Sequence, residues 1–373
     1  MIKIPKLINN ITQLQIFKNL WFNSFSTIPK LSEELGIDRS NISRNLRHLL
    51  KYELVKSRDE KEATNNIGRK ANIIELNEKK GYNIGIVVTE NLVASFLTDL
   101  RLNIIKQNRI EERIDYNNLL TFLEKCIDPF KNFFEKTLCI SIAFPGAVNT
   151  KEGELFYSRP IPLNQTENIR NKIQKKFDMP VYLENDANAG AMYYLLKNKY
   201  KYPNIVYSLF AIHFNENKVL GYLGNGIVIN KQLYEGSNFF AGKIYQDTME
   251  VLRINKKIFN VQQLKEYFSQ RENLEEDLCN FIEELSNKMS YVINLYDPAA
   301  YILGGYIKVF PKKIQKLLLQ KLQEKIVDFE ERNHQFFIDE SLLKSSAIGA
   351  SASLINKIFT DPNIANKYLS KII

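Results

Sequence analysis

Cysteine and histidine are scarce in this chain of 373 residues. The three cysteines, Cys126, Cys139 and Cys279, are odd in number and show no Cys-x-x-Cys spacing, which argues against a disulfide framework and a thiolate zinc site. We expect them to be reduced thiols in the core. Only three histidines occur, far apart in the sequence, so the ligands for a tetrahedral zinc site are lacking.

Long hydrophobic runs are also missing. Nowhere do about 18 consecutive apolar residues occur, as a membrane-spanning helix would need. The N-terminal sequence Met-Ile-Lys-Ile-Pro lacks the apolar stretch of a signal peptide. We therefore expect a cytoplasmic protein without membrane contact, and its length predicts several modules.

Positive charge is concentrated near the N-terminus. The chain carries 51 Lys and Arg against 42 Asp and Glu, a formal net charge of +9. Residues 1–80 contain 15 basic and 9 acidic residues, so six of these nine charges lie in the first fifth of the chain. A cationic first module suits nucleic acid, although a Lys-rich composition can also serve solubility alone.

Residues 26–50 have the pattern of a helix-turn-helix. Apolar residues at helical spacing predict one helix from Ile28 and a second that ends near Leu50, with Gly36 in the turn. Asp38 is placed to cap the second helix, because its carboxylate can accept from free backbone N–H groups. The second helix presents an outward polar face of Arg39, Ser40, Asn41, Ser43, Arg44 and Arg47.

This polar face suits double-stranded DNA. A helix-turn-helix reads the major groove with the first turns of its second helix, and arginine, asparagine and serine suit base edges and phosphates. The alternative is an ordinary helical hairpin whose polar face is simply exposed to water.

The flanking segments predict a winged helix. Upstream, a third amphipathic helix is indicated by Leu14, Phe17, Leu20 and Trp21. Downstream, a strand from Leu54 and a return strand at 73–76 form a β-hairpin wing. Arg69 and Lys70 follow a glycine near its tip or return and are suited to a phosphate or a narrow minor groove.

From Tyr82 onward the pattern is that of an α/β domain. Three successive strands predict an antiparallel meander at 83–89, 92–99 and 102–107. The next elements expected are a helix at 117–136, a strand at 138–144, a loop with Gly153, a helix at 166–177 and a strand at 180–183. The theme returns with strands at 204–214 and 218–230, helices over 261–296, a strand at 300–303 and closing helices. Two α/β halves joined near residue 195 would leave a cleft between them.

The order of the motifs resembles transcriptional repressors of the ROK family (repressor, open reading frame, kinase), of the xylose-repressor type. The likeness covers essentially the whole chain. Its most specific part is Glu-Asn-Asp-Ala-Asn at 184–188, and the other matching stretches are the winged helix ending at 68–70, Asp99, 144–148 with Gly153, 180–189, 224–230 with 234–236, 240–242, 303–305 and 347–350.

The resemblance implies a winged helix-turn-helix followed by a two-lobed, actin-like sugar-kinase fold of the α/β class. The implied domains are 1–78 for DNA binding, 79–195 with a C-terminal helix near 358–373 for the first lobe, and 196–357 for the second. A sugar would bind between the lobes. The implied ligand-binding residues are Gly146, Asn185, Asp186, Lys243 and Gln246.

Asn185 and Asp186 directly follow a predicted strand, at the edge where α/β ligand sites form. An amide and a carboxylate there can bind neighbouring sugar hydroxyls, and in kinases of the family the matching aspartate is the catalytic base. Asp186 can alternatively cap the helix that starts near Ala187.

Departures from the family pattern argue against kinase activity. Residues 85–91 and 220–226 stand where the kinases have glycine-rich phosphate loops, but the first has lost the glycines and Asp, and the second has a bulky Tyr222. Phosphoryl transfer depends on positioning by such loops and their Mg²⁺. We therefore predict no catalytic residues, no cofactor and, since the family's zinc-binding cysteines are absent, no metal.

Lys243 replaces a glutamate that contacts sugar in the family, which reverses the charge in the pocket. Either the effector is anionic, such as a sugar phosphate, or the pocket has changed and binds a neutral sugar differently or nothing. The sequence thus predicts a homodimeric or tetrameric repressor of sugar-utilisation genes. The alternatives are a constitutive DNA-binding protein with a degenerate pocket and a sugar kinase with an added DNA-binding module.

Overall fold

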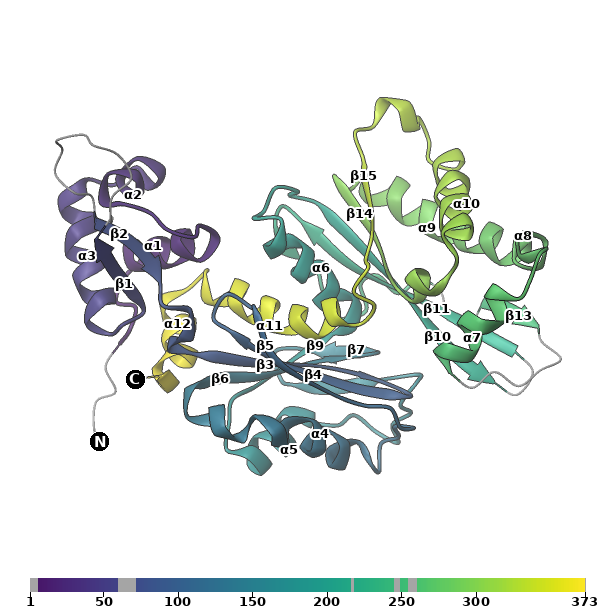
Figure 1. Cartoon of the computed structure of the whole chain (residues 1–373), viewed down its shortest axis with the longest axis horizontal. Coiled ribbons are helices and arrows are strands. Elements are labelled where there is room, and N and C mark those ends of the chain that lie inside the picture. The colour runs from purple at the N-terminus through teal and green to yellow at the C-terminus, as the bar shows by residue number, and fades with distance from the viewer. Residues whose placement is uncertain (1–5, 60–71, 216–217, 245–248, 254–259, 373) are drawn as a thin grey trace.

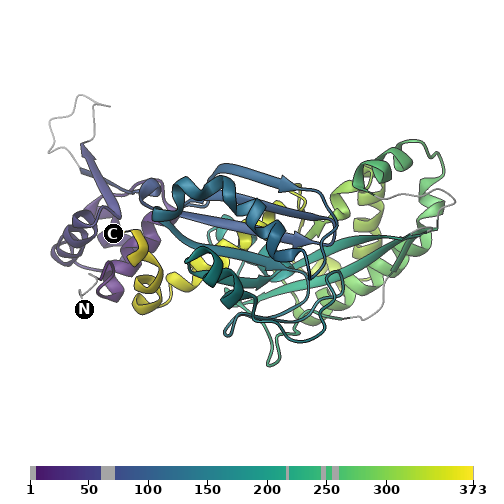
Figure 2. The ribbon, with the colours of Figure 1, turned by 90° about the horizontal axis from the view of Figure 1, so that it is seen from below.

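The computed structural model describes residues 6–59, 72–215, 218–244, 249–253 and 260–372. The molecule is elongated. A small N-terminal domain lies at one end, a first α/β lobe follows it, and the helices of a second lobe lie at the other end (Figures 1 and 2).

The N-terminal domain is a winged helix, as the sequence predicts. Its elements are α1 (Ile11–Phe22), α2 (Ile28–Leu35), α3 (Arg39–Lys51) and an antiparallel hairpin of β1 (Val55–Asp59) and β2 (Asn72–Leu76). Gly36 adopts φ +65°, a left-handed conformation that ends α2 and that side chains disfavour. Asp38 accepts from the backbone N–H of Asn41 at 2.8 Å and caps α3.

The first lobe is built on a five-stranded sheet with strand order β5-β4-β3-β6-β9. Its strands are β3 (Tyr82–Thr89), β4 (Leu92–Asp99), β5 (Ile104–Ile110), β6 (Thr137–Phe144) and β9 (Val181–Asn185), after the 3₁₀ turn η1 (Glu78–Lys80). The predicted antiparallel meander is confirmed in β3, β4 and β5. One face is covered by α4 (Leu119–Ile127), η2 (Asp128–Lys136) and α5 (Ile169–Phe177).

Two expectations for this lobe were wrong in detail. The single helix expected over 117–136 is divided into α4 and the 3₁₀ segment η2, where Pro129 lacks the N–H that a continuing α-helix needs. The segment around Gly153, expected as a loop, forms a hairpin of β7 (Ala147–Asn149) and β8 (Glu154–Tyr157).

The second lobe contains a six-stranded sheet. It runs β12-β11-β10-β14-β15 with β13 also paired to β11; the strands are β10 (Ile205–Asn215), β11 (Lys218–Ile229), β12 (Gln232–Leu233), β13 (Met249–Arg253), β14 (Ala300–Gly305) and β15 (Gln335–Ile338). Its helices are α7 (Val261–Ser269), α8 (Leu274–Asp277), α9 (Cys279–Tyr296) and α10 (Lys312–Glu324), with 3₁₀ turns η3 (Tyr306–Val309) and η4 (Phe329–Glu331). The sequence did not predict the short strands β13 and β15.

Cysteine placement corrects one expectation. Cys126 and Cys139 are buried thiols, as expected, and burial raises their pKa values to about 11 and about 12. Cys279 is exposed at the start of α9 instead of lying in the core.

Two helices pack side by side between the sheets (Figure 1): α6 (Asp186–Lys197) lies on β10 and β11, and α11 (Lys344–Ile358) lies on the first-lobe sheet. Their close approach depends on glycine. A Cβ built on Gly349 of α11 would lie 1.9 Å from the carbonyl oxygen of Ala189 in α6. Helix α12 (Pro362–Leu369) and the 3₁₀ turn η5 (Ser370–Ile372) then lead back toward the winged helix.

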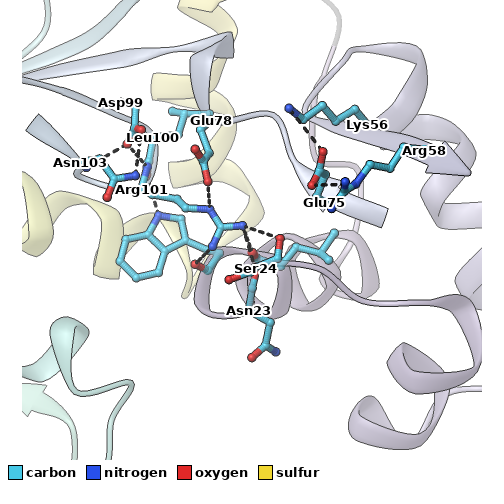
Figure 3. A network of polar contacts seen from close by, with 12 residues as sticks. Asn23, Ser24, Lys56, Arg58, Glu75, Glu78, Asp99, Leu100, Arg101 and Asn103 are labelled. Atoms are coloured by element: carbon cyan, nitrogen blue, oxygen red, sulfur yellow. Dashed lines mark hydrogen bonds and ion pairs between the residues drawn. The ribbon is translucent and has the colours of Figure 1, made fainter. Parts of the chain in front are cut away.

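The winged helix is docked on the turn that follows β4 (Figure 3). The Arg101 guanidinium donates to backbone carbonyls at the C-terminal end of α1, among them those of Leu20 and Asn23 at 2.9 Å each. It also forms an ion pair with Glu78 at 2.5 Å. The Trp21 indole donates in return to the carbonyl of Leu100 at 2.6 Å. The hydrogen bonds from Arg101 satisfy carbonyls that the end of α1 leaves without a partner in the helix.

Further contacts attach the winged helix to the C-terminal helices. Asn366 of α12 accepts from the backbone N–H groups of Leu7 and Ile8 at 2.8 and 3.0 Å. The ring of Phe359, directly after α11, lies 5.5 Å from that of Trp21. The winged helix is therefore joined to the first lobe through packed and hydrogen-bonded contacts.

Gly349→Ala is expected to destabilise the protein by about 1–3 kcal/mol, because the methyl group would be forced into a backbone carbonyl of α6. Thermal unfolding of the variant measures the effect. The matched control is Gly224→Ala, where the new Cβ would meet only the Cβ of Ala187 at 3.6 Å. Equal melting temperatures for the two variants would contradict this account of the α6–α11 contact.

Candidate functional site

Helix α3 exposes a cationic face. Arg39, Ser40, Arg44 and Arg47 are exposed, and Asn41 and Ser43 are half-buried. Ser40 donates to the capping carboxylate of Asp38 at 2.6 Å, and the Asn41 side-chain oxygen accepts from Asn45 at 2.7 Å. The arginines of this face are exposed, whereas Ser40 and Asn41 also serve to order the first turns of the helix.

The wing supplies further cations beside this face. Lys56 and Arg58 are exposed on β1, and each forms an ion pair with Glu75 of β2 at 3.5 Å (Figure 3). Arg69 and Lys70, expected near the tip of the wing, lie outside the described residues. Their contact with DNA stays a prediction.

A cavity of about 680 Å³ lies between the two lobes. Four of the five predicted ligand-binding residues line it together, although they come from distant parts of the sequence: Gly146, Asn185, Asp186 and Lys243. The fifth, Gln246, lies outside the described residues. A cavity of this size between domains is typical of small-molecule sites.

The strand–helix junction at the cavity is organised by Asn185. Its side-chain oxygen accepts from the N–H groups of Ala187 and Asn188 at 3.0 Å each, so that Asn185 is the cap of α6. Its amide nitrogen donates to the Gly146 carbonyl at 2.8 Å and to Asp186 at 3.0 Å. The expectation that Asp186 could itself be the cap is thus corrected: Asp186 is the first helical residue, and its Oδ1 accepts from Ala187 at 2.9 Å.

Two carboxyl groups at this junction have raised pKa values. Burial raises the pKa of Asp186 to about 6, against opposing effects of the Ala187 N–H and of Lys243. Burial likewise raises the pKa of Glu184 to about 7, and Tyr182 donates to this side chain at 3.0 Å. A perturbed carboxyl group that lines a cavity is a frequent feature of functional sites.

Aromatic side chains surround the cations of the cavity, and sequence reasoning missed most of them. The Lys243 ammonium lies 5.0 Å from the ring centre of Tyr157 and 4.9 Å from that of Phe240. The Arg159 guanidinium lies 5.4 Å from the ring centre of Tyr222. Of these residues the sequence points only to Tyr222, as the bulky substitution in a phosphate loop. The sequence gives no signal for Arg159, because this residue follows a hairpin that the sequence does not predict.

The two segments that stand at the positions of the kinases' phosphate loops make contacts with other parts of the protein. The carboxylate of Glu90, in the turn after β3, forms a hydrogen bond with the ring of His213 in β10. Residues 220–226 lie within β11, which pairs with β10 and β13. Within the described ranges, no three His, Cys, Asp or Glu side chains gather as metal ligands, and no helix is long and apolar enough to cross a membrane.

A winged helix joined to two α/β lobes, with a cavity between the lobes, defines a two-lobed class of fold that carries a winged-helix head. Residues 83–253 match the family model described as "ROK family". This segment therefore matches a ROK family domain, in agreement with the resemblance of the sequence.

The chain is similar to several known proteins. The xylose repressor of Staphylococcus xylosus is 26% identical over 370 residues, which cover 96% of this chain and 85% of that protein. A crystal structure of a ROK family transcriptional regulator, a homologue of the E. coli MLC protein, matches 96% of this chain and 100% of its own with a TM-score of 0.68 at 18% identity. A ROK family glucokinase from Streptomyces griseus, in complex with glucose and AMPPNP, matches 74% of this chain and 100% of its own with a TM-score of 0.54 at 17% identity.

Asp186→Asn should change how stability depends on pH. Because the pKa of Asp186 rises from 3.8 to about 6 on folding, the folded protein retains a proton that the unfolded chain has lost between these values, and stability falls as pH rises through this window. The asparagine keeps the Oδ1 acceptor but does not titrate. Chemical unfolding from pH 4 to 7 should show the variant gaining stability relative to the parent.

The exposed Asp128→Asn variant is the control, since it removes a carboxylate of a surface ion pair. A constant difference between parent and Asp186→Asn across the pH range would contradict the assignment.

Proposed function

We propose that the protein is a DNA-binding transcriptional repressor whose two-lobed domain responds to a sugar or sugar-like effector. The observation that carries the proposal is the combination of an exposed arginine face on α3 with a polar interlobe cavity in the same chain. The names of its relatives support the same conclusion, since the Staphylococcus protein is a xylose repressor.

In the proposed complex, α3 lies in the major groove of a roughly palindromic operator. Arg44 and Arg47 contact bases or phosphates from the exposed face, together with Arg39 and the polar side chains of the first turns. The wing lies beside the groove, and Arg69 and Lys70 contact the backbone or the minor groove.

Dimerisation would present two such heads to the two half-sites. The strongest candidate surface lies on the second lobe, where Tyr291, Leu295 and Val327 are 62%, 74% and 57% exposed. Tyr291 and Leu295 share one face of α9. Asn294 accepts from the Val327 N–H at 3.0 Å, which fixes Val327 next to this helix. Neighbouring exposed apolar side chains of this size favour a protein interface.

Helix α6 extends from the cavity to the winged helix and would couple a bound effector to the DNA-binding face. The helix begins at Asp186 in the cavity, and Tyr200, three residues after its end, packs against Phe22 of α1 with ring centres 5.1 Å apart. The Tyr200 hydroxyl also donates to Asn356 of α11 at 2.5 Å. A ligand that shifts α6 relative to α11 would therefore change the orientation of the winged helix, provided it prefers one arrangement.

Kinase activity is not part of the proposal. The carboxylate of Glu90 stands in the segment where kinases of the family contact phosphate, and Arg159 packs on Tyr222 in the other such segment. A constitutive DNA-binding protein with a degenerate pocket is the second candidate, favoured by the replacement of the family's sugar-contacting glutamate by Lys243.

Alanine substitution of Arg44 or Arg47 should weaken binding to a selected duplex by about ten-fold or more, since a lost base contact costs about 1–3 kcal/mol. Fluorescence anisotropy with a labelled duplex measures the affinity at several salt concentrations. Where the lost contact was to phosphate, the salt dependence becomes shallower.

Arg113→Ala is the matched control, because it removes the same charge from an exposed position outside the winged helix. DNA affinity that falls equally in the control, or that stays unchanged in both α3 variants, would contradict the proposed interface.

Leu295→Glu should convert the dimer into a monomer, because it places a charge in the centre of the apolar surface. Analytical ultracentrifugation reports the mass, and circular dichroism confirms that the variant is folded. Leu120→Glu, at another exposed leucine in the first lobe, should leave the dimer intact. A parent protein that sediments as a monomer, or a Leu295→Glu dimer as stable as the parent's, would argue against this surface.

A further inference from the structure

Two cations from opposite lobes face the interlobe cavity. Arg159 follows β8 in the first lobe, and Lys243 belongs to the second; both line the cavity. Each packs on an aromatic ring of the other lobe, Arg159 on Tyr222 and Lys243 on Tyr157. The two pairs thus form reciprocal cation–π contacts across the gap between the lobes.

Neither positive charge is neutralised by a carboxylate contact within the described part of the chain. No ion pair or hydrogen bond to a carboxylate involves Arg159 or Lys243 there. Burial lowers the pKa of Lys243, Asp186 raises it, and Arg159 lowers it again. Asp186 and Arg159 therefore both act on Lys243 through their charges, and Lys243 forms no ion pair with Asp186.

A third cation that lines the cavity, Lys288, does have a carboxylate partner. Lys288 forms an ion pair with Glu284 at 2.5 Å, so its charge is already compensated. Arg159 and Lys243 lie against the faces of aromatic rings, a contact that leaves N–H donors available for further hydrogen bonds.

The simplest alternative is that these contacts only hold the lobes together. Uncharged aromatic or aliphatic pairs would serve that purpose without placing two like charges beside one cavity, where burial opposes the charge of Lys243. An anionic group between them would remove the mutual repulsion and form charge-assisted hydrogen bonds, with arginine able to bind a carboxylate or phosphate through two parallel N–H donors.

We propose that the cavity binds a small carbohydrate bearing a carboxylate or phosphate group, and that Arg159 and Lys243 bind this group from opposite lobes while Asp186 accepts a hydrogen bond from a hydroxyl. The inference rests on the proposed function only in taking the cavity as the effector site. Because the two cations belong to different lobes, the anionic group would connect the lobes directly.

Isothermal titration calorimetry with the full chain tests this assignment. The probes are glucuronate and gluconate for the carboxylate arm, glucose 6-phosphate and xylose 5-phosphate for the phosphate arm, and glucose, xylose and inorganic phosphate for comparison. At least one acidic carbohydrate should bind at least ten-fold more tightly than its neutral counterpart and than inorganic phosphate. The arm that binds identifies the anionic group.

Lys243→Gln and Arg159→Gln should each weaken the acidic probe at least ten-fold and change the affinity for neutral sugars little. Lys131→Gln is the matched control, since it removes a lysine charge from the surface, and it should bind like the parent. Thermal unfolding establishes that each variant is folded.

Absence of binding by every acidic probe, a neutral sugar that binds as tightly, or variants with unchanged affinity would overturn the inference. The DNA assay separates it from the proposed function. An acidic probe that binds through Arg159 and Lys243 but leaves operator affinity unchanged would support the ligand assignment while contradicting effector control.

Discussion

The close packing of α6 on α11 is the contact on which the arrangement of the molecule depends. Helix α6 lies on the second-lobe sheet and α11 on that of the first, so their interface determines how the lobes meet. Gly349 permits an approach to the Ala189 carbonyl that any side chain would prevent. Protein interiors at this density tend to adopt discrete arrangements rather than deform continuously, which suits a contact that relates two lobes.

The same two helices reach both proposed functional regions. At its N-terminus α6 is capped by Asn185 beside the cavity, and beyond its C-terminus Tyr200 packs against α1. Phe359, directly after α11, packs against Trp21 of α1. Arg101 donates hydrogen bonds to carbonyls at the C-terminal end of α1. If the winged helix were attached only by a flexible linker, a change in the cavity would not alter its orientation. These packed contacts instead connect the cavity to the winged helix, as the proposed coupling requires.

Much of this organisation could be predicted from sequence. The winged helix, the meander and the grouping of Asn185, Asp186 and Lys243 follow from local periodicity and from recognisable motifs. Arg159 could not be foreseen, because its position depends on a short hairpin and on the closure of the lobes, which no local pattern records. The sequence also could not predict that Asn185, and not Asp186, caps α6. Both residue types favour that position, and only the geometry at the end of the strand decides between them.

The most direct measurement of the central claim is selection of bound DNA from a random pool with the full chain, followed by titration of the enriched duplex with neutral and acidic sugars. The account predicts enrichment of a palindromic site, which one sugar or sugar derivative releases. No enrichment would contradict DNA recognition by the winged helix, and an enriched site that no sugar affects would contradict control by the cavity.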